Sequence, residues 1–140
     1  MNSHRLEVSL THEGHPEDTF KATVGVTVKT VIAGGVILAY YEPHQQAKVI
    51  VNCKSLKKFS ITRRQLSTPA TTSHLHFSLS KSEVSDYETP YGRLTLTTKL
   101  ETSSGSFDYH TPGPFLTARY RLFSQEELLG IYTLRLLFKD

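Results

Sequence analysis

Hydrophobic and polar residues alternate along most of this chain in short runs separated by turn-forming residues. In the longest run, Phe20 to Val28, every even-numbered residue is apolar and the odd-numbered ones are Lys, Thr or Gly. A period of two places these two sets on opposite faces of a strand, so the even-numbered residues are expected to face a core. The other runs begin near Leu6, Val36, Val49, Phe59, Leu75, Leu94, Leu116 and Leu134.

These runs predict an all-β protein. Helical spacing is confined to residues 124–130, where Ser124 is a candidate N-cap for one helical turn. The Gly34-Gly35 pair predicts a tight hairpin after the longest run. Strands at short, even intervals with hairpin-length loops predict a single antiparallel up-and-down barrel of eight to ten strands over residues 1–140. An extra strand between Glu83 and Glu88 remains an open alternative.

Three segments also carry a family resemblance: VILAYYE around Tyr40, the stretch from Tyr87 to Leu100 with its Tyr91-Gly92 turn, and the closing pair FLTARYRLF and YTLRLLFKD. In order and spacing they resemble the YwiB-like family of Gram-positive bacteria. The resemblance implies a lipocalin-like (calycin) barrel in a small cytoplasmic bacterial protein. The function of that family is not established, so no catalytic residue is carried over.

Length and composition agree with one soluble domain. The chain has 140 residues, a mass of 15.8 kDa and a formal net charge of +3. It contains no apolar stretch near the roughly 20 residues that span a bilayer and no apolar segment typical of a signal peptide, so a cytoplasmic protein without a membrane partner is expected. The single cysteine, Cys53, shares the parity of Val49 and Val51 and is expected to be a small buried side chain.

No familiar catalytic motif is present: the chain has no G-x-S-x-G elbow, phosphate loop, dinucleotide fingerprint or C-x-x-C pair. The sequence therefore indicates a protein that is not an enzyme and needs no cofactor. His74 and His76 lie two apart on one strand face and could bind a metal with His44 or Glu42. Since Leu75 and Phe77 face the core, both imidazoles are expected in solvent, and no metal site is predicted.

The segment from Lys54 to Arg64 carries five cations and no acid. Lys54, Lys57, Lys58 and Arg64 are the candidate contacts to nucleic acid phosphates. An ordinary solvated strand surface is the favoured interpretation, because Phe59 has the inward parity and is unavailable for stacking.

Two charged residues have the parity of the core. Arg63 continues the inward register of Phe59 and Ile61, and Glu42 continues that of Leu38 and Tyr40. Burying either charge alone would be costly, so near the end of a barrel they are expected to pair with each other or to hold a polar group of a ligand.

Two functions compete. The favoured one is a binding protein that holds a small, largely apolar and possibly anionic ligand in the barrel. The rival is a filled barrel that acts through its surface, as a protein or RNA contact or as a homodimer. If the strands follow in order, the long loops after the first, third, fifth and seventh strands gather at one end and mark the mouth. The candidate ligand-binding residues there are Tyr40, Glu42, Arg63, His44, His74 and Tyr109.

Overall fold

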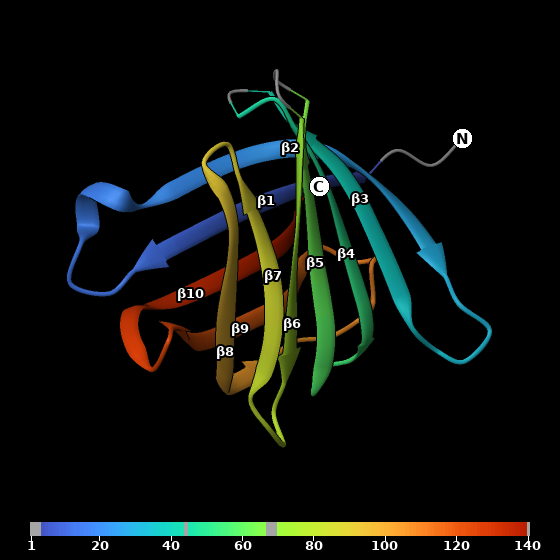
Figure 1. The fold of residues 1–140 in the computed structure, drawn as a ribbon. Helices are drawn as coiled ribbons and strands as arrows, with labels where there is room; N and C mark the ends of the chain where they lie inside the picture. The colour runs from blue at the N-terminus through green and yellow to red at the C-terminus, as the bar shows by residue number, and fades with distance from the viewer. Residues whose placement is uncertain (1–3, 44, 67–69, 140) are drawn as a thin grey trace.

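The computed structural model describes residues 4–43, 45–66 and 70–139. Within them, ten antiparallel strands close into one barrel in which neighbours in the chain are neighbours in the sheet and β1 pairs with β10 (Figure 1). The predicted all-β, up-and-down barrel is confirmed. The strands are β1 (His4–His12), β2 (Phe20–Thr30), β3 (Val36–Glu42), β4 (Ala47–Ser55), β5 (Lys58–Gln65), β6 (Thr71–Ser78), β7 (Glu83–Thr89), β8 (Gly92–Ser104), β9 (Gly113–Ser124) and β10 (Glu127–Lys139).

The core consists of the inward-facing residues of nearly every strand. Val24 and Val26 of β2 are buried while Thr23 and Thr27 are exposed, as the alternation predicts. Cys53 is fully buried, and burial raises the pKa of its thiol to about 12, so the thiol stays protonated. The barrel end away from the loop after β1 is filled by aromatic rings, with Phe59 stacked on Phe77 at a centroid distance of 4.8 Å.

Turn chemistry explains the hairpins. At the predicted turn between β2 and β3, Gly34 has a φ of 95°, and a Cβ on Gly35 would lie 2.8 Å from the main-chain oxygen of Cys53. The helical turn predicted at residues 124–130 is wrong. Gln125 and Glu126 have φ values of 50° and 69° and form the tight turn between β9 and β10. Their left-handed conformation is typical of a two-residue hairpin turn. β9 and β10 therefore continue up to this turn, and no helix forms.

The only helix in the described part of the chain is a short 3-10 turn, η1 (Pro16–Asp18), between β1 and β2. No helix of those residues has the length and apolar character needed to cross a bilayer.

The segment from Glu83 to Thr89 is a strand, β7, which settles the open alternative. In β7 a polar residue faces inward and an apolar one faces outward: Ser85 is buried, whereas Val84 on the other face is 64% exposed. β7 reverses the direction of every later strand. The loop after β8 therefore lies at the end opposite the loops after β1, β3 and β5.

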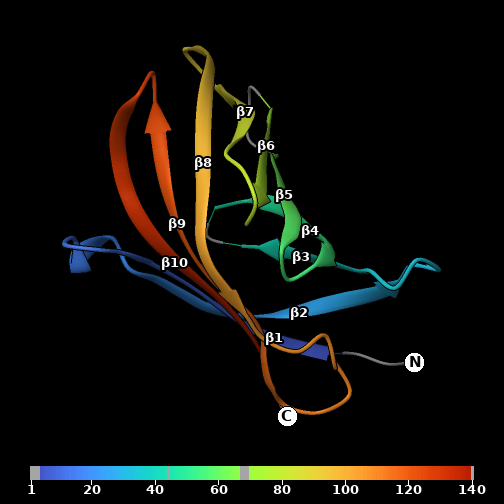
Figure 2. The same cartoon turned by 90° about the horizontal axis from the view of Figure 1, so that it is seen from below.

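That loop, residues 105–112, covers one end of the barrel and is the orange segment beside β1 in Figure 2. Phe107 stacks on Phe115 at a centroid distance of 4.8 Å, and Tyr109 packs edge-on against His4 at 5.5 Å. Both aromatic rings pack against the core cluster. The barrel is thus filled and covered at this end.

Candidate functional site

A cavity of about 460 Å³ opens at the other end of the barrel. Loops after β1 and β3 and the β7–β8 turn contribute to its rim through Asp18, Gln45 and Pro90. Apolar and aromatic side chains from β9, β10, β1 and β2 line one side, and β3, β5, β6 and β7 contribute most of the polar and charged residues on the other. The lining residues include Val8, Leu10, Phe20, Tyr40, Glu42, Ile61, Arg63, Thr71, Ser73, Leu75, Tyr87, Glu88, Tyr120, Leu122, Tyr132 and Leu134.

Glu42 and Arg63 form the predicted ion pair inside this cavity. The two Nη atoms of Arg63 lie 3.0 and 3.1 Å from the two carboxylate oxygens of Glu42, and Nη1 also donates to Oε1 of Gln45 at 2.5 Å. Ala47, the residue opposite Glu42 on β4, is small and fully buried. Glu42 is 1% exposed and Arg63 29% exposed, so the carboxylate lies deeper than a rim position.

Four tyrosines line the cavity, and the pKa values of three of them, Tyr40, Tyr120 and Tyr132, are raised. Tyr40 lies in the same lateral row of the sheet as Arg63, with Val49 of β4 between them. Burial and the nearby Glu42 raise the pKa of Tyr40, although Arg63 opposes the shift. Tyr120 and Tyr132 stack at a centroid distance of 5.6 Å, and burial raises the pKa of both hydroxyls. All three phenols therefore remain neutral hydrogen-bonding groups at neutral pH.

The charge of the lining is negative. Asp18, Glu42 and Glu88 supply three carboxylates, against the single guanidinium of Arg63. Glu88 accepts a hydrogen bond from the main-chain nitrogen of Thr72 at 2.8 Å, and Arg93 approaches it at 3.8 Å. Arg63 already contacts Glu42 and Gln45, so an anion would compete with the Glu42 carboxylate for this guanidinium.

Not every predicted site residue lies at this cavity. Tyr109 was expected at the mouth, and this placement is wrong, because β7 reverses the later strands and moves its loop to the opposite end. His74 was also expected around the mouth, but it has the outward parity of β6, is exposed, and has Nδ1 3.0 Å from the hydroxyl of Thr62. His44 lies outside the described residues. Tyr40, Glu42 and Arg63 are brought together as predicted.

Sequence reasoning missed several lining residues. In the described part of the chain, Ser73 and Tyr87 form the one backbone pair between β6 and β7, and they continue the lateral row of Tyr40 and Arg63. Inward parity could have identified Ser73, but the inverted pattern of β7 concealed Tyr87. A second omission is a cluster of His12, His15 and Asp18 at the rim.

The basic residues lie on the outer surface. Lys54, Lys57, Lys58 and Arg64 are all exposed, and none of the described acidic residues forms an ion pair with them. Arg64 lies opposite Lys48 across β4 and β5. Phe59 is 3% exposed, which confirms that it belongs to the core.

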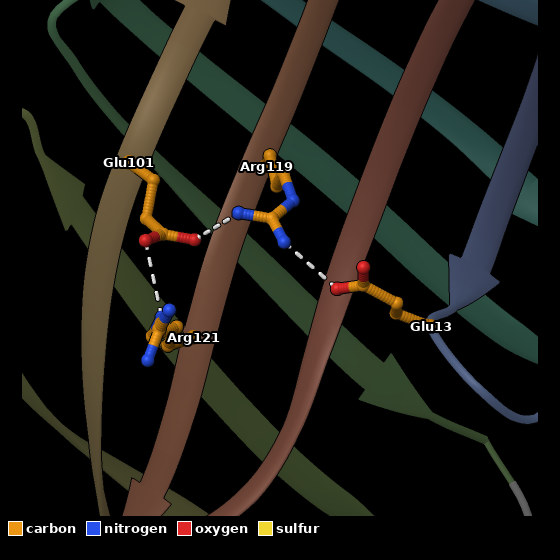
Figure 3. A network of polar contacts seen from close by, with 4 residues as sticks. All are labelled: Glu13, Glu101, Arg119 and Arg121. Atoms are coloured by element: carbon orange, nitrogen blue, oxygen red, sulfur yellow. Dashed lines mark hydrogen bonds and ion pairs between the residues drawn. The ribbon is translucent and has the colours of Figure 1, made fainter.

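A second polar network lies on the outside of β8 and β9 (Figure 3). A bulge in β8 between Leu100 and Thr102 accommodates Glu101, whose carboxylate accepts from both Arg119 and Arg121. Nη2 of Arg119 also lies 2.8 Å from Oε2 of Glu13. The network therefore ties the loop after β1 to β9.

Comparison with known proteins supports the fold. The chain is similar to a crystal structure of the ywiB protein from Bacillus subtilis, with a TM-score of 0.68 and 20% sequence identity over 99% of this chain and 89% of that chain. No curated protein matches the chain. The family model described as "Domain of unknown function (DUF1934)" matches residues 6–136. Since this match spans nearly the whole chain, the protein belongs to the DUF1934 family.

Proposed function

We propose that this protein is a non-catalytic binding protein that holds one small, largely apolar ligand in the open end of the barrel. The observation that carries the proposal is the cavity of about 460 Å³, within the roughly 300–1,000 Å³ typical of ligand pockets. Such pockets combine a mostly apolar and aromatic wall with a small number of polar groups. Here the apolar side formed by β9, β10, β1 and β2 faces the polar residues of β3, β5, β6 and β7. The ligand would therefore have an apolar body and a small polar head.

The charges of the lining suggest which head group fits. Glu42 and the three neutral phenols offer hydrogen-bonding partners to a hydroxyl, amide or amine. An anionic head would have to compete with Glu42 for Arg63 and would face two further carboxylates. We therefore favour a neutral or cationic head group over the anionic one that Arg63 alone suggested.

A thermal-shift series tests this proposal. A fatty acid, the corresponding alcohol and the corresponding amine share one apolar chain and differ only in head charge. A ligand present at about 100 times its Kd stabilises the folded state by about 2.7 kcal/mol. We expect the alcohol or the amine to raise Tm by several degrees and the acid to have a smaller effect. Native mass spectrometry would show a complex with one ligand per chain.

Two phenylalanine substitutions test whether the ligand binds in this cavity. Ser73→Phe fills the cavity from β6, because Ser73 is buried and lines it. His74→Phe, one residue along on the outer face, is the matched control. The shift should vanish in Ser73→Phe and persist in His74→Phe. An undiminished shift in Ser73→Phe, or no shift with any of the three compounds, would count against the cavity as the binding site.

A second function is favoured by the outer face of β4 and β5. The sequence from residue 43 to 82 contains no acidic residue, and Tyr41, Lys48 and Arg64 lie in one lateral row. Together with Lys54, Lys57 and Lys58, these residues make an unopposed basic surface that could contact a single-stranded nucleic acid.

Salt-dependent titration of a labelled single strand tests that surface. Each phosphate contact contributes about 0.7 to the salt slope for a single strand, so replacing Lys54, Lys57 and Lys58 with Gln should reduce the slope by about 2. Replacing Lys21, Lys81 and Lys99 changes the net charge equally at positions away from this face. No binding at about 50 mM salt would exclude this function.

A further inference from the structure

Three potential metal ligands meet at the rim of the cavity. His12 ends β1, Asp18 ends η1, and His15 lies between them. The main-chain nitrogen of His15 donates to the oxygen of His12 at 2.9 Å, and that of Asp18 donates to the oxygen of His15 at 2.9 Å. Such hydrogen bonds between residues three apart place side chains i and i+3 above one another. One ligand atom from each residue therefore lies within 4.8 Å of the other two.

The position of His12 is fixed before any ligand binds. Its side chain is 13% exposed and its ring stacks on Tyr132 at a centroid distance of 4.4 Å and an interplanar angle of 22°. The ring packs against Gly130, where a Cβ would collide with Nε2. Nδ1 points the other way and lies 3.2 Å from Oδ2 of Asp18. The absence of a side chain at Gly130 thus allows the orientation that directs Nδ1 to the cluster.

The loop that carries the other ligands is anchored through Glu13. The main-chain nitrogen of Glu13 donates to the oxygen of Ile131 at 2.8 Å, and the Glu13 carboxylate pairs with Arg119 (Figure 3). Oε1 of Glu17 lies 3.4 Å from Nδ1 of His15, where a carboxylate can orient the imidazole. A ligand set held in place before binding loses less entropy when an ion arrives.

We propose that His12, His15 and Asp18 bind one divalent transition-metal ion at the mouth of the barrel, with Zn²⁺ as the best-matched ion. Two imidazole nitrogens and one carboxylate oxygen are a donor set that Zn²⁺ and its neighbours prefer over Mg²⁺ or Ca²⁺. Three protein ligands leave at least one coordination position open. Because Asp18 also lines the cavity, the ion would lie at the edge of the space where the ligand of the proposed function would bind. The metal site itself does not depend on that function.

The test uses the untagged, full-length protein after treatment with a chelator, because a histidine tag would bind the same ions. Calorimetric titration with Zn²⁺ measures stoichiometry and affinity, and Co²⁺ replaces Zn²⁺ for visible absorption spectra. The test variants are His15→Ala and Asp18→Asn, at exposed positions where substitution leaves the barrel core intact. The double variant His74→Ala/His76→Ala is the control, because it removes two exposed histidines from the outer face of β6.

We expect one Zn²⁺ per chain and Co²⁺ absorption bands of a protein-bound ion. Each test variant should weaken binding by more than about 10-fold, since even the loss of an outer hydrogen-bonding partner commonly costs that much. The control should bind like the original protein, and circular dichroism should show the same strand content in all variants. Absence of stoichiometric binding, or equal affinity in His15→Ala, or a loss of binding in the control, would overturn the proposal.

Discussion

At the scale of single residues, the buried pair of Glu42 and Arg63 is the most consequential feature. Removing Arg63 leaves the Glu42 carboxylate buried without its counter-charge. Loss of one partner of a buried pair costs about 3–5 kcal/mol, and the partial exposure of Arg63 favours the lower end of this range. We therefore expect Arg63→Met to lower the free energy of unfolding by about 3 kcal/mol in urea denaturation.

The double variant Glu42→Gln/Arg63→Met is the control, because it removes the carboxylate charge as well. It should be more stable than Arg63→Met alone. A loss of about 1 kcal/mol or less in Arg63→Met would instead indicate a solvated surface pair.

Three tyrosines of the cavity predict a fall in stability at alkaline pH. The pKa values of Tyr40, Tyr120 and Tyr132 are raised from 10.0 in the folded state. Above pH 10 the unfolded state releases phenolic protons that the folded state retains, so the free energy of unfolding decreases as pH rises. Urea denaturation at a series of pH values from neutral to alkaline measures this slope. Tyr40→Phe should make the slope shallower, and an unchanged slope would contradict the assignment.

At the scale of elements, the register of β2 can be tested by adjacent substitutions. Val26 is 5% exposed, whereas Thr27 faces solvent and donates to the main-chain oxygen of Ala39 at 3.3 Å. Val26→Asp places an unpaired charge in the core and should cost more than about 3 kcal/mol, which prevents stable folding. Thr27→Asp should change stability by about 1 kcal/mol or less. Similar thermal denaturation of the two variants would refute the register.

The seam between β6 and β7 is the least regular part of the sheet. Among the described residues it has one backbone pair, Ser73 with Tyr87, and side chains replace the missing ladder bonds. The hydroxyl of Ser85 accepts from the main-chain nitrogen of His76 at 3.0 Å. Ser85→Ala leaves that partly buried donor without its partner and should cost about 1 kcal/mol.

Hydrogen exchange measures the same seam directly. The amide of His76 should exchange faster in Ser85→Ala than in the original protein, because the opening of the seam then requires less free energy. Ser60→Ala, on the outer face of β5, is the control and should change stability by no more than about 0.5 kcal/mol. Unaltered exchange at His76 would mean that the Ser85 contact does not hold the seam.

At the scale of the whole molecule, closure depends on the pairing of β1 with β10, the two ends of the chain. Eight residue pairs from Arg5–Lys139 to His12–Tyr132 join these strands. Deleting residues 1–12 would expose the edges of β2 and β10, which are templates for association with other chains. We expect the truncated protein to aggregate and to lose cooperative unfolding, as measured by light scattering and circular dichroism. A monomeric, cooperatively folding product would show that closure is dispensable.

The strands and their inward faces were largely predictable from the sequence. The face on which a strand residue lies depends on alternation with its immediate neighbours, and this local information is complete in runs such as Phe20 to Val28. The same parity identified Tyr40, Glu42 and Arg63 as inward residues. β7 escaped this reasoning, because its one buried residue is Ser85 while Val84 faces solvent.

Only the tertiary structure decided which residues lie at each end of the barrel. One additional strand reverses all later ones, so it moved Tyr109 from the predicted mouth to the opposite end. The meeting of His12 with Asp18, and the stacking of His12 on Tyr132 of β10, depend on a turn conformation and on the pairing of the two chain ends. Residue alternation determines the face of a strand, but the direction and register of strands depend on contacts between residues far apart in the chain.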